Sequence, residues 1–262
     1  MTTNGAATTK ARPKGRGSKG AKREALLSIR DVDAYYGPVR ALGGVSLEIG
    51  VGQKVALLGA NGAGKTTTLR TISGIVSPQA GEITFAGERI DGLAPHKIVG
   101  KGIAHLPEGR QLFSGMSVEE NLRFGYYPRR KERGGLDAAL DRAMDYFPRL
   151  RERRKQAAGT LSGGEQQMLG VARALMSSPQ LLLVDELSLG LAPIVVEALF
   201  EILDQVNREG TAVLIVEQFV HMALANTHRA YVLQKGEVVA DEDSSRLLGD
   251  PTLVESYLGA EV

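Results

Sequence analysis

Short apolar runs alternate along the chain with stretches in which apolar residues recur every three or four positions. Four runs are rich in β-branched residues or leucine, as is typical of buried strands: Val55–Leu58, Leu181–Val184, Ala212–Val216 and Ala230–Leu233. Helical periodicity begins at three places, namely at Lys65, near Gly164 and at Pro193. This alternation predicts an α/β fold in which helices cover a parallel or mixed sheet.

The second and third of these helices each have one apolar face. The face of the helix near Gly164 consists of Met168, Val171, Ala172, Leu175 and Met176. The face of the helix from Pro193 consists of Val196, Leu199, Phe200 and Leu203. Between about residues 108 and 160 the chain becomes rich in charge and poor in β-branched residues, which predicts a largely helical insertion. We expect the run Arg149–Lys155 within it to form a solvated helix face.

The length of 262 residues suits one globular unit, which we expect over residues 25–262. Residues 1–24 carry seven basic side chains and one acidic one but almost no large apolar side chain, so we expect a disordered basic tail. This tail is either a solvated extension or a weak contact for anionic lipid headgroups. Because the tail holds the basic excess, the folded part is net acidic and we expect no nucleic-acid partner.

The composition excludes several classes of function. The chain has no cysteine, which rules out a disulfide scaffold, a zinc finger, an iron–sulfur site and a cysteine nucleophile. Its longest apolar run, Ala212–Val216, has five residues, whereas a membrane-spanning helix needs roughly 20. We therefore expect any membrane role to be peripheral.

The strongest motif is a glycine-rich loop between the first apolar run and the helix that begins at Lys65. Its residues are Gly59, Ala60, Asn61, Gly62, Ala63, Gly64, Lys65, Thr66 and Thr67. They contain the pattern GxxxxGK[ST], whose glycines let successive backbone N–H groups face an anion at a helix N-terminus. We therefore expect a phosphate-binding loop in which Lys65 reaches the β- and γ-phosphates of a nucleotide and Thr66 ligates Mg²⁺.

Two adjacent acids follow the apolar run Leu181–Val184. Ligands bind at the carboxyl ends of the strands in open α/β sheets, which places Asp185 and Glu186 near such a loop. We expect Asp185 to hold Mg²⁺, directly or through water, and Glu186 to orient or deprotonate an attacking water.

A second helix N-terminus is marked by LSGGEQQ at residues 161–167. Its residues Ser162, Gly163 and Gly164 form either a simple helix cap or a second phosphate cradle. One nucleotide needs only one cradle, so a second one suggests that it completes the site of another copy.

These motifs in this order resemble the ATP-binding-cassette (ABC) ATPases over essentially residues 26–262. LSGGEQQ looks like their signature motif, since Ser162 lies 97 residues after Lys65 and 24 before Glu186. The resemblance implies a P-loop NTPase fold: a RecA-like α/β core with an antiparallel β subdomain and a helical subdomain. It also implies a head-to-tail dimer, in which the signature of one subunit closes over ATP on the other and residues 188–191 contact the opposite subunit.

The same resemblance assigns roles by position. Tyr36 corresponds to an aromatic residue that stacks on adenine, with Tyr35 as the competing candidate. Glu108 stands where a glutamine senses the γ-phosphate through Mg²⁺ and water, and Gln218 where a histidine contacts the γ-phosphate. An amide can donate a hydrogen bond there but cannot become charged. Three residues further on, His221 is expected to be packed or at the surface.

One further residue departs from the general pattern: Leu187 replaces the proline that normally follows the acid pair. The segments PEGR, VEENL, DELSLGLAP and VEQ together resemble the LivF-type ATPases of branched-chain amino-acid transport, in which the substitutions at 108 and 218 are usual. The resemblance implies an ATPase that uses ATP and Mg²⁺ and lies peripherally on the cytoplasmic face of the cell (inner) membrane. Its implied partners are transmembrane permease subunits, which the segment around residues 111–121 would contact, a second ABC ATPase subunit (self or sister) and, indirectly, a periplasmic or extracellular solute-binding protein.

Three alternatives remain at this stage. An importer of urea or short-chain amides, or a lipopolysaccharide-type exporter, shares most of these motifs. A cassette ATPase that acts on DNA or in translation usually carries long insertions, for which a lone cassette of 262 residues has no room. A P-loop kinase would not need the LSGG segment.

Overall fold

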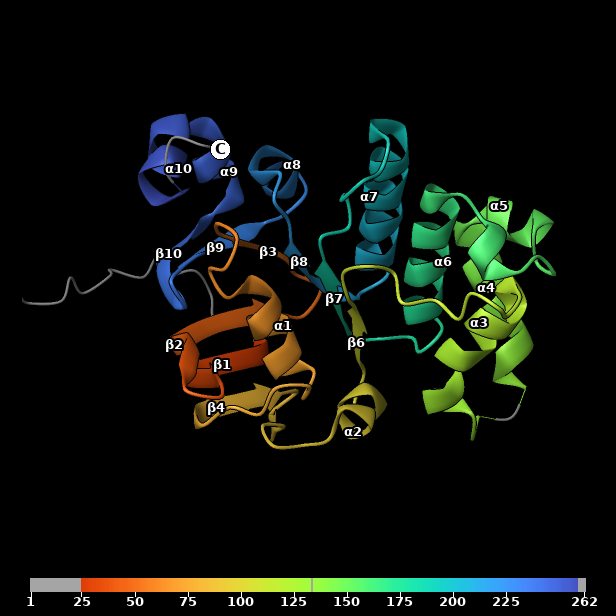
Figure 1. Cartoon of the computed structure of the whole chain (residues 1–262), viewed down its shortest axis with the longest axis horizontal. Coiled ribbons are helices and arrows are strands. Elements are labelled where there is room, and N and C mark those ends of the chain that lie inside the picture. The colour runs from red at the N-terminus through yellow and green to blue at the C-terminus, as the bar shows by residue number, and fades with distance from the viewer. Residues whose placement is uncertain (1–24, 133, 259–262) are drawn as a thin grey trace, which may run out of the picture.

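The computed structural model of the protein describes residues 25–132 and 134–258, so the tail predicted for residues 1–24 lies outside the described residues. An antiparallel sheet in the order β2-β1-β4-β5 forms the N-terminal part (Figure 1). Its strands are β1 (Ala25–Tyr36), β2 (Val39–Gly50), β4 (Ala80–Phe85) and β5 (Glu88–Arg89). In the register of this sheet, Ile29 of β1 lies opposite Leu47 on one side and Ile83 on the other.

A second, larger sheet in the order β10-β9-β3-β8-β7-β6 positions the candidate site. Its strands are β3 (Lys54–Leu58), β6 (Ile103–Leu106), β7 (Leu181–Asp185), β8 (Ala212–Val216), β9 (Arg229–Gln234) and β10 (Glu237–Asp243). The strands from β9 to β6 run parallel, and β10 pairs antiparallel with β9. All four strands predicted from apolar runs are therefore confirmed, and so is the α/β fold class with its antiparallel subdomain.

Every residue of β3, β7 and β8 is buried. Alternate residues of these strands belong to separate apolar clusters: Leu183 packs with the antiparallel sheet and α1, whereas Leu182 packs with the helices on the other face. A strand covered on both faces reads as a continuous apolar run, which explains why the sequence pattern identified these strands so clearly.

Helices that flank the large sheet begin close to where the sequence predicts them. They are α1 (Lys65–Ile72), α6 (Gly163–Leu175) and α7 (Pro193–Arg208). The apolar face predicted for α7 is buried throughout, and that of α6 is buried or partly buried. The shorter helices are α2 (Pro95–Gly100), α8 (Val220–Ala225), α9 (Ser244–Gly249) and α10 (Pro251–Leu258).

A helical region lies at the side of the molecule away from the antiparallel sheet (Figure 1). It contains α3 (Val118–Gly125), α4 (Gly135–Tyr146) and α5 (Pro148–Glu152), with short 3₁₀ turns at Tyr127–Arg129 and Ala158–Thr160. Among the described residues between β6 and β7, no segment forms a strand. Tyr126, Leu140 and Leu150 join this region to α6 through one apolar cluster.

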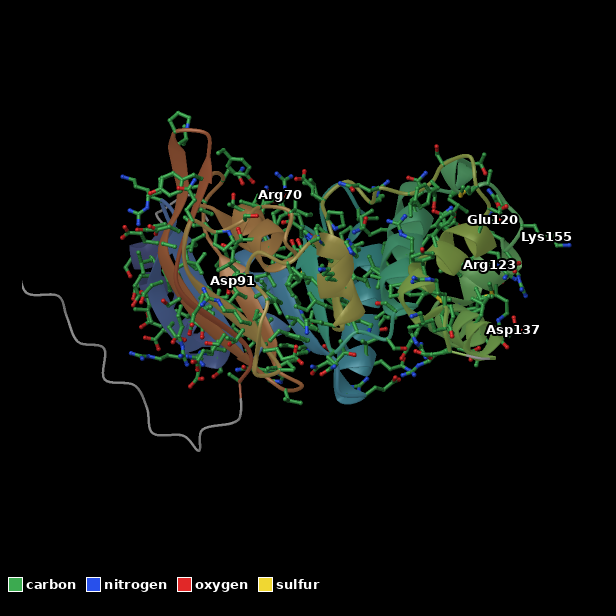
Figure 2. All side chains as sticks on the ribbon, turned by 90° about the horizontal axis from the view of Figure 1, so that it is seen from below. Arg70, Asp91, Glu120, Arg123, Asp137 and Lys155 are labelled. Carbon is green, nitrogen blue, oxygen red and sulfur yellow. The ribbon has the colours of Figure 1, made fainter. Side chains whose placement is uncertain are left out.

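The charged run at residues 149–155 departs in part from the expected solvated face. Lys155 is exposed and extends outward at the helical end of the molecule (Figure 2). Arg153, however, forms a 2.7 Å ion pair with Glu165 of α6, and Arg154 forms a 2.6 Å pair with Glu119 of α3. These two arginines connect three helices because α5 ends before them and the chain turns back toward its neighbours.

Candidate functional site

The ends of four neighbouring parallel strands meet at one edge of the large sheet. The loop after β3 begins with Gly59, β8 is followed by Gln218, β7 ends with Asp185, and Glu108 follows β6. Because β3, β8, β7 and β6 are adjacent and parallel, their carboxyl ends lie side by side. Residues that are up to 159 positions apart in the sequence are thereby brought to a common edge.

The glycines of the loop after β3 have backbone conformations that other residues rarely adopt. Gly62 and Gly64 have φ of 77° and 109°, and a Cβ on Gly59 would lie 2.4 Å from the carbonyl oxygen of Leu233. Gly64 caps α1 without a side-chain hydrogen bond to the first-turn N–H groups. These donors have no partner within the helix, so they form an anion site at its N-terminus.

The Lys65 ammonium lies within this loop. Its Nζ donates to the carbonyl oxygens of Gly59 at 2.7 Å and Ala60 at 3.2 Å, which leaves one of its three protons for a further acceptor. Burial lowers the pKa of Lys65, while the nearby carboxylates of Glu186 and Asp185 oppose this shift. A helix N-terminus with uncapped first-turn N–H groups beside a buried cation is suited to a polyphosphate.

Thr66 and Asp185 meet beside the loop. The Thr66 hydroxyl donates to Asp185 Oδ1 at 3.2 Å, and Asp185 Oδ2 is buried with no hydrogen-bond partner. Burial raises the pKa of Asp185 to about 6, against the Thr66 hydrogen bond, with Glu186 and Glu108 adding to the rise. A buried carboxylate oxygen without a partner, next to a hydroxyl oxygen, fits a hard cation such as Mg²⁺, which prefers oxygen ligands.

The carboxylate of Glu186 lies next to this pair and is held by an amide. Gln218 Nε2 is 3.2 Å from Glu186 Oε1, 3.3 Å from Oε2 and 3.2 Å from the Oδ1 of Asn61 in the phosphate loop. Glu186 has φ of 50°, in the left-handed region that non-glycine residues seldom occupy. A strained, solvent-accessible acid with a fixed orientation is suited to accept a proton from a water.

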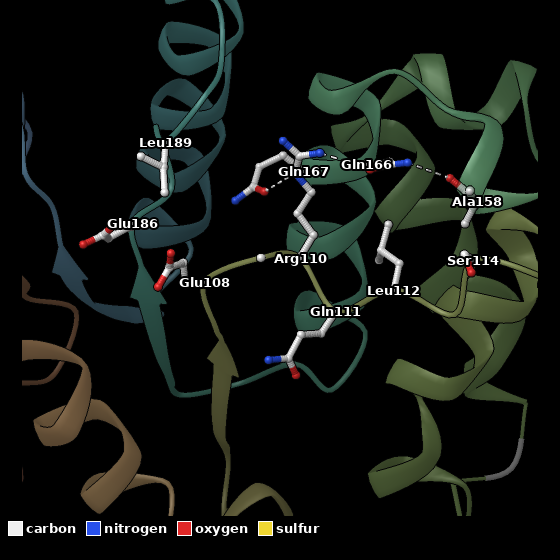
Figure 3. Close-up of a pocket in the computed structure, with 12 residues that line it drawn as sticks. Glu108, Arg110, Gln111, Leu112, Ser114, Ala158, Gln166, Gln167, Glu186 and Leu189 are labelled. Carbon is white, nitrogen blue, oxygen red and sulfur yellow. Dashed lines mark hydrogen bonds between the residues drawn. The ribbon is translucent and has the colours of Figure 1, made fainter.

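Glu108 lines a cavity between the large sheet and the helical region. The cavity has a volume of about 430 Å³, and Figure 3 shows Glu108 beside Glu186 at one side of it, with Gln166 and Gln167 of α6 across from them. Glu108 is exposed at the end of β6, on the same sheet edge as the other acids. Its role toward a metal or phosphate stays a prediction.

The two tyrosines at the end of β1 differ in exposure. Tyr36 is 45% exposed, whereas Tyr35 is partly buried. Tyr36 pairs with Val39 across the tight turn that joins β1 to β2, so its ring is available to a planar ligand. This difference favours Tyr36 over Tyr35 as the adenine-stacking residue.

Ser162 is the N-cap of α6 and forms a capping box. Its hydroxyl accepts from the Glu165 N–H, and the Glu165 side chain accepts from the Ser162 N–H. Ser162 and Gly163 are both exposed. Figure 1 shows α6 on the helical side of the central sheet, whereas α1 lies beside the antiparallel sheet. The signature segment is therefore a local cap and is separate from the phosphate loop of its own chain.

Sequence reasoning assigned no role to Arg110 or Glu217. Arg110 donates from Nη1 to Gln166 and from Nε to Gln167, at 3.0 and 3.3 Å, and so links the loop after β6 to the signature helix (Figure 3). Glu217 is 1% exposed and accepts two hydrogen bonds from Ser188. Glu217 could have been found from the sequence, because it is an acid that directly follows the apolar run Ala212–Val216.

The structure shows the surroundings of Leu187 and Gln218, two residues that depart from the general pattern of the motifs. Leu187 is fully buried in the apolar cluster between the sheet and α7, which accounts for a large apolar residue after the acid pair. His221 is exposed on α8, whereas Gln218 contacts the phosphate loop and Glu186.

A large, mostly parallel sheet with a glycine-rich loop after β3, flanked by an antiparallel sheet and a helical region, is the architecture of P-loop ATPase cassettes. The sequence profile described as ABC transporter matches residues 42–188. The chain belongs to the ABC transporter family and is an ATP-binding cassette with ATPase function.

Individual relatives support the same assignment over most of the chain. The chain is 47% identical to the high-affinity branched-chain amino acid transport ATP-binding protein BraG of Pseudomonas aeruginosa, over 89% of this chain and 100% of that protein. It is 37% identical to the probable branched-chain amino acid transport ATP-binding protein LivF of Archaeoglobus fulgidus, over 85% and 94%. A crystal structure of a nucleotide-free ATP-binding cassette from an ABC transporter matches with a TM-score of 0.79 and 26% identity, over 90% and 99% of the two chains.

Proposed function

We propose that this chain hydrolyses ATP to drive the import of branched-chain amino acids through separate permease subunits. The observation that carries the catalytic part is the meeting of Lys65, the Thr66–Asp185 pair and Glu186 at one sheet edge. The solute class is supported by the full-length similarity to BraG. Among the helices of the described residues, none combines the length and the apolar character that a membrane span requires.

The side chains of this site divide the work of hydrolysis. The loop N–H groups and Lys65 would hold the β- and γ-phosphates, and the exposed ring of Tyr36 would stack on adenine. Thr66 and Asp185 would hold Mg²⁺, with Glu108 as a further oxygen ligand or acceptor, and the bound ion would neutralise phosphate charge. This partition leaves Glu186 free to act on water.

Glu186 would then take a proton from a water molecule as the water oxygen attacks the γ-phosphorus. The bond from the γ-phosphorus to the bridging oxygen breaks, which yields ADP and phosphate. Gln218 would donate to the γ-phosphate and, through its bond to the Glu186 carboxylate, keep the base oriented. Glu186 and Gln218 lie in the turns that follow β7 and β8, two neighbouring strands of the large sheet, which suits a pre-organised site.

The signature segment leads to a proposal about assembly. The N-terminus of α6 is exposed and lies apart from the phosphate loop of its own chain, so Ser162, Gly163 and Gly164 would complete a site on a second cassette. The second cassette is a copy of this chain or a sister chain, in a head-to-tail dimer. Permease subunits would hold this dimer at the cytoplasmic face of the membrane, and a solute-binding protein would deliver the amino acid to them.

Two variants and a solute panel test the proposal. Lys65→Ala should abolish nucleotide binding or hydrolysis, and Glu186→Gln should bind ATP but barely turn it over. Lys97→Ala and Glu201→Gln, exposed residues on α2 and α7, are matched controls that should hydrolyse normally. In proteoliposomes with the permease and binding protein, hydrolysis should rise with leucine, isoleucine or valine. Stimulation by urea alone would contradict the solute class, and normal hydrolysis by Lys65→Ala would contradict the site.

A further inference from the structure

Three successive residues at the end of β8, namely Val216, Glu217 and Gln218, form hydrogen bonds with the turn that follows β7. The Glu186 N–H donates to Val216 O at 2.9 Å, and Gln218 donates to the Glu186 carboxylate. Between these two contacts, Glu217 accepts from the Ser188 N–H at 3.1 Å and from the Ser188 hydroxyl at 2.6 Å. One carboxylate therefore uses both oxygens on a single residue, two positions after Glu186.

Both partners of this contact are shielded from water. Glu217 is 1% exposed and Ser188 is 5% exposed, while Leu187 between Glu186 and Ser188 is fully buried. A buried carboxylate costs free energy unless hydrogen bonds compensate for its lost hydration, and the two bonds from Ser188 do so here. The Glu217 carboxylate therefore restrains the backbone at Ser188, the residue that follows Leu187.

The restrained segment contains a strained residue. Glu186 has φ of 50°, a strained conformation that persists at a non-glycine residue only where surrounding contacts enforce it. The Val216 contact holds the N–H side of this residue, and the Glu217–Ser188 contact holds the turn that follows it. Loss of the second contact would let the turn relax and move the Glu186 carboxylate.

We infer that Glu217 is a positioning residue for ATP hydrolysis: by clamping Ser188 it keeps the Glu186 backbone strained and its carboxylate aimed at the reacting water. This inference rests on the proposed role of Glu186. Glu217 touches neither nucleotide nor water in this assignment and acts only through Ser188. Its removal therefore affects turnover and leaves nucleotide binding, which depends on the loop after β3, in place.

The test compares steady-state ATP hydrolysis and binding of a fluorescent ATP analogue by the purified full-length chain. Glu217→Ala should lower kcat about 10- to 100-fold, as expected for a misplacement near 1 Å, with KM for ATP changed less than about twofold. Glu217→Gln should restore most of kcat, because an amide can still accept one bond from Ser188 and donate another to its hydroxyl. The double variant Glu217→Ala/Ser188→Ala should have the same kcat as Glu217→Ala alone, because both changes remove the same contact.

A matched control separates positioning from general stability. Ser244 is also fully buried, and its hydroxyl bonds to that of Thr227 at 2.8 Å, but it follows β10 at the opposite edge of the sheet. Ser244→Ala should lower the unfolding midpoint and leave kcat unchanged. A normal kcat in Glu217→Ala, or an equal loss of kcat in Ser244→Ala, would overturn the inference. If Glu217→Ala does not fold, Ser188→Ala and Ser188→Thr decide it, since only the threonine keeps the hydroxyl.

Glu186→Gln, measured in the same series, separates the role of Glu217 from that of Glu186. If Glu186→Gln loses turnover while Glu217→Ala keeps it, Glu186 remains the base and Glu217 has no positioning role. If both keep the wild-type rate, the role of Glu186 is itself wrong, and the positioning inference is overturned with it.

Discussion

Gln218 joins the phosphate loop to the acid after β7, because its Nε2 lies 3.2 Å from Asn61 Oδ1 and 3.2 Å from Glu186 Oε1. Asn61 and Glu186 are 125 positions apart in the sequence, and Gln218 is 32 positions beyond the second. A single amide can serve both because each partner offers an acceptor oxygen. In the proposed mechanism one proton of this Nε2 group would go to the γ-phosphate, and the other would keep the Glu186 carboxylate oriented.

Replacement of Gln218 by leucine removes that donor. We expect turnover of Gln218→Leu to fall roughly 10²–10³-fold, as for the loss of one transition-state donor. Gln218→His should retain activity and add an ionisation near pH 6–7, the usual range of an exposed imidazole. His221→Ala, on the neighbouring helix α8, is the control and should hydrolyse ATP normally. Full activity in Gln218→Leu together with loss in His221→Ala would identify His221 as the phosphate contact instead.

Ser162→Arg tests whether the signature acts on a second copy. The exposed N-terminus of α6 lies apart from its own phosphate loop, so the variant should bind ATP nearly as tightly as the wild type but lose turnover in the assembled complex. The substitution also removes the capping hydroxyl, which costs about 1 kcal/mol of stability. Ser117→Ala removes the equivalent cap of α3 at a comparable cost and is the control that should stay active. Equal loss of binding and turnover in Ser162→Arg would indicate action within one chain or a collapsed fold.

Arg110 lies in a segment with a strained backbone, so replacements at this position should differ in stability. Gly109, Arg110 and Gln111 have φ of 79°, 62° and 42°, three successive left-handed residues. Arg110→Ala and Arg110→Gly both lose the bonds to α6, but only alanine keeps the strain of a Cβ at positive φ. We expect Arg110→Gly to be more stable than Arg110→Ala by about 1 kcal/mol in urea unfolding. Equal stability of the two variants would mean that the backbone of this loop relaxes freely.

Glu119 should contribute to the free energy of unfolding in a way that is lost at acid pH. Hydrogen bonds from Arg154 and then Arg123 lower the pKa of Glu119 to about 2 from its usual 4.5. A depressed carboxyl pKa stabilises the fold above the unfolded-state value and loses this effect as the pH falls from about 4.5 toward 2. Glu119→Gln should therefore lower the free energy of unfolding by about 1 kcal/mol at pH 7, and the difference should shrink at pH 3.

The control for this experiment is another acid-to-amide change in the same region. Glu152 is 67% exposed and lies 4.0 Å from its partner Arg149. Glu152→Gln should leave the urea midpoint unchanged at both pH values, because an exposed, long ion pair contributes little. A pH-independent difference between Glu119→Gln and the wild type would contradict the assignment of the effect to ionisation.

The sequence by itself determined the elements that depend on local pattern. Strands covered on both faces appear as apolar runs, so Ala212–Val216 was delimited to the residue. The phosphate loop could be predicted because its glycines and Lys65 are contiguous, and because anion binding there uses the backbone of one segment. Family membership followed from the spacing of such contiguous motifs.

Only the tertiary structure decided which residues meet across the ends of the strands. Gln218 contacts Asn61 and Glu186 because β8 lies between β3 and β7 in the sheet. The hydrogen bond between Glu217 and Ser188 depends on the same order of strands. The burial of Leu187 and the pairing of Arg154 with Glu119 likewise depend on elements distant in sequence. A side chain's local pattern carries no information about such partners, since hydrogen bonding and burial are set by whatever the fold places within a few ångströms.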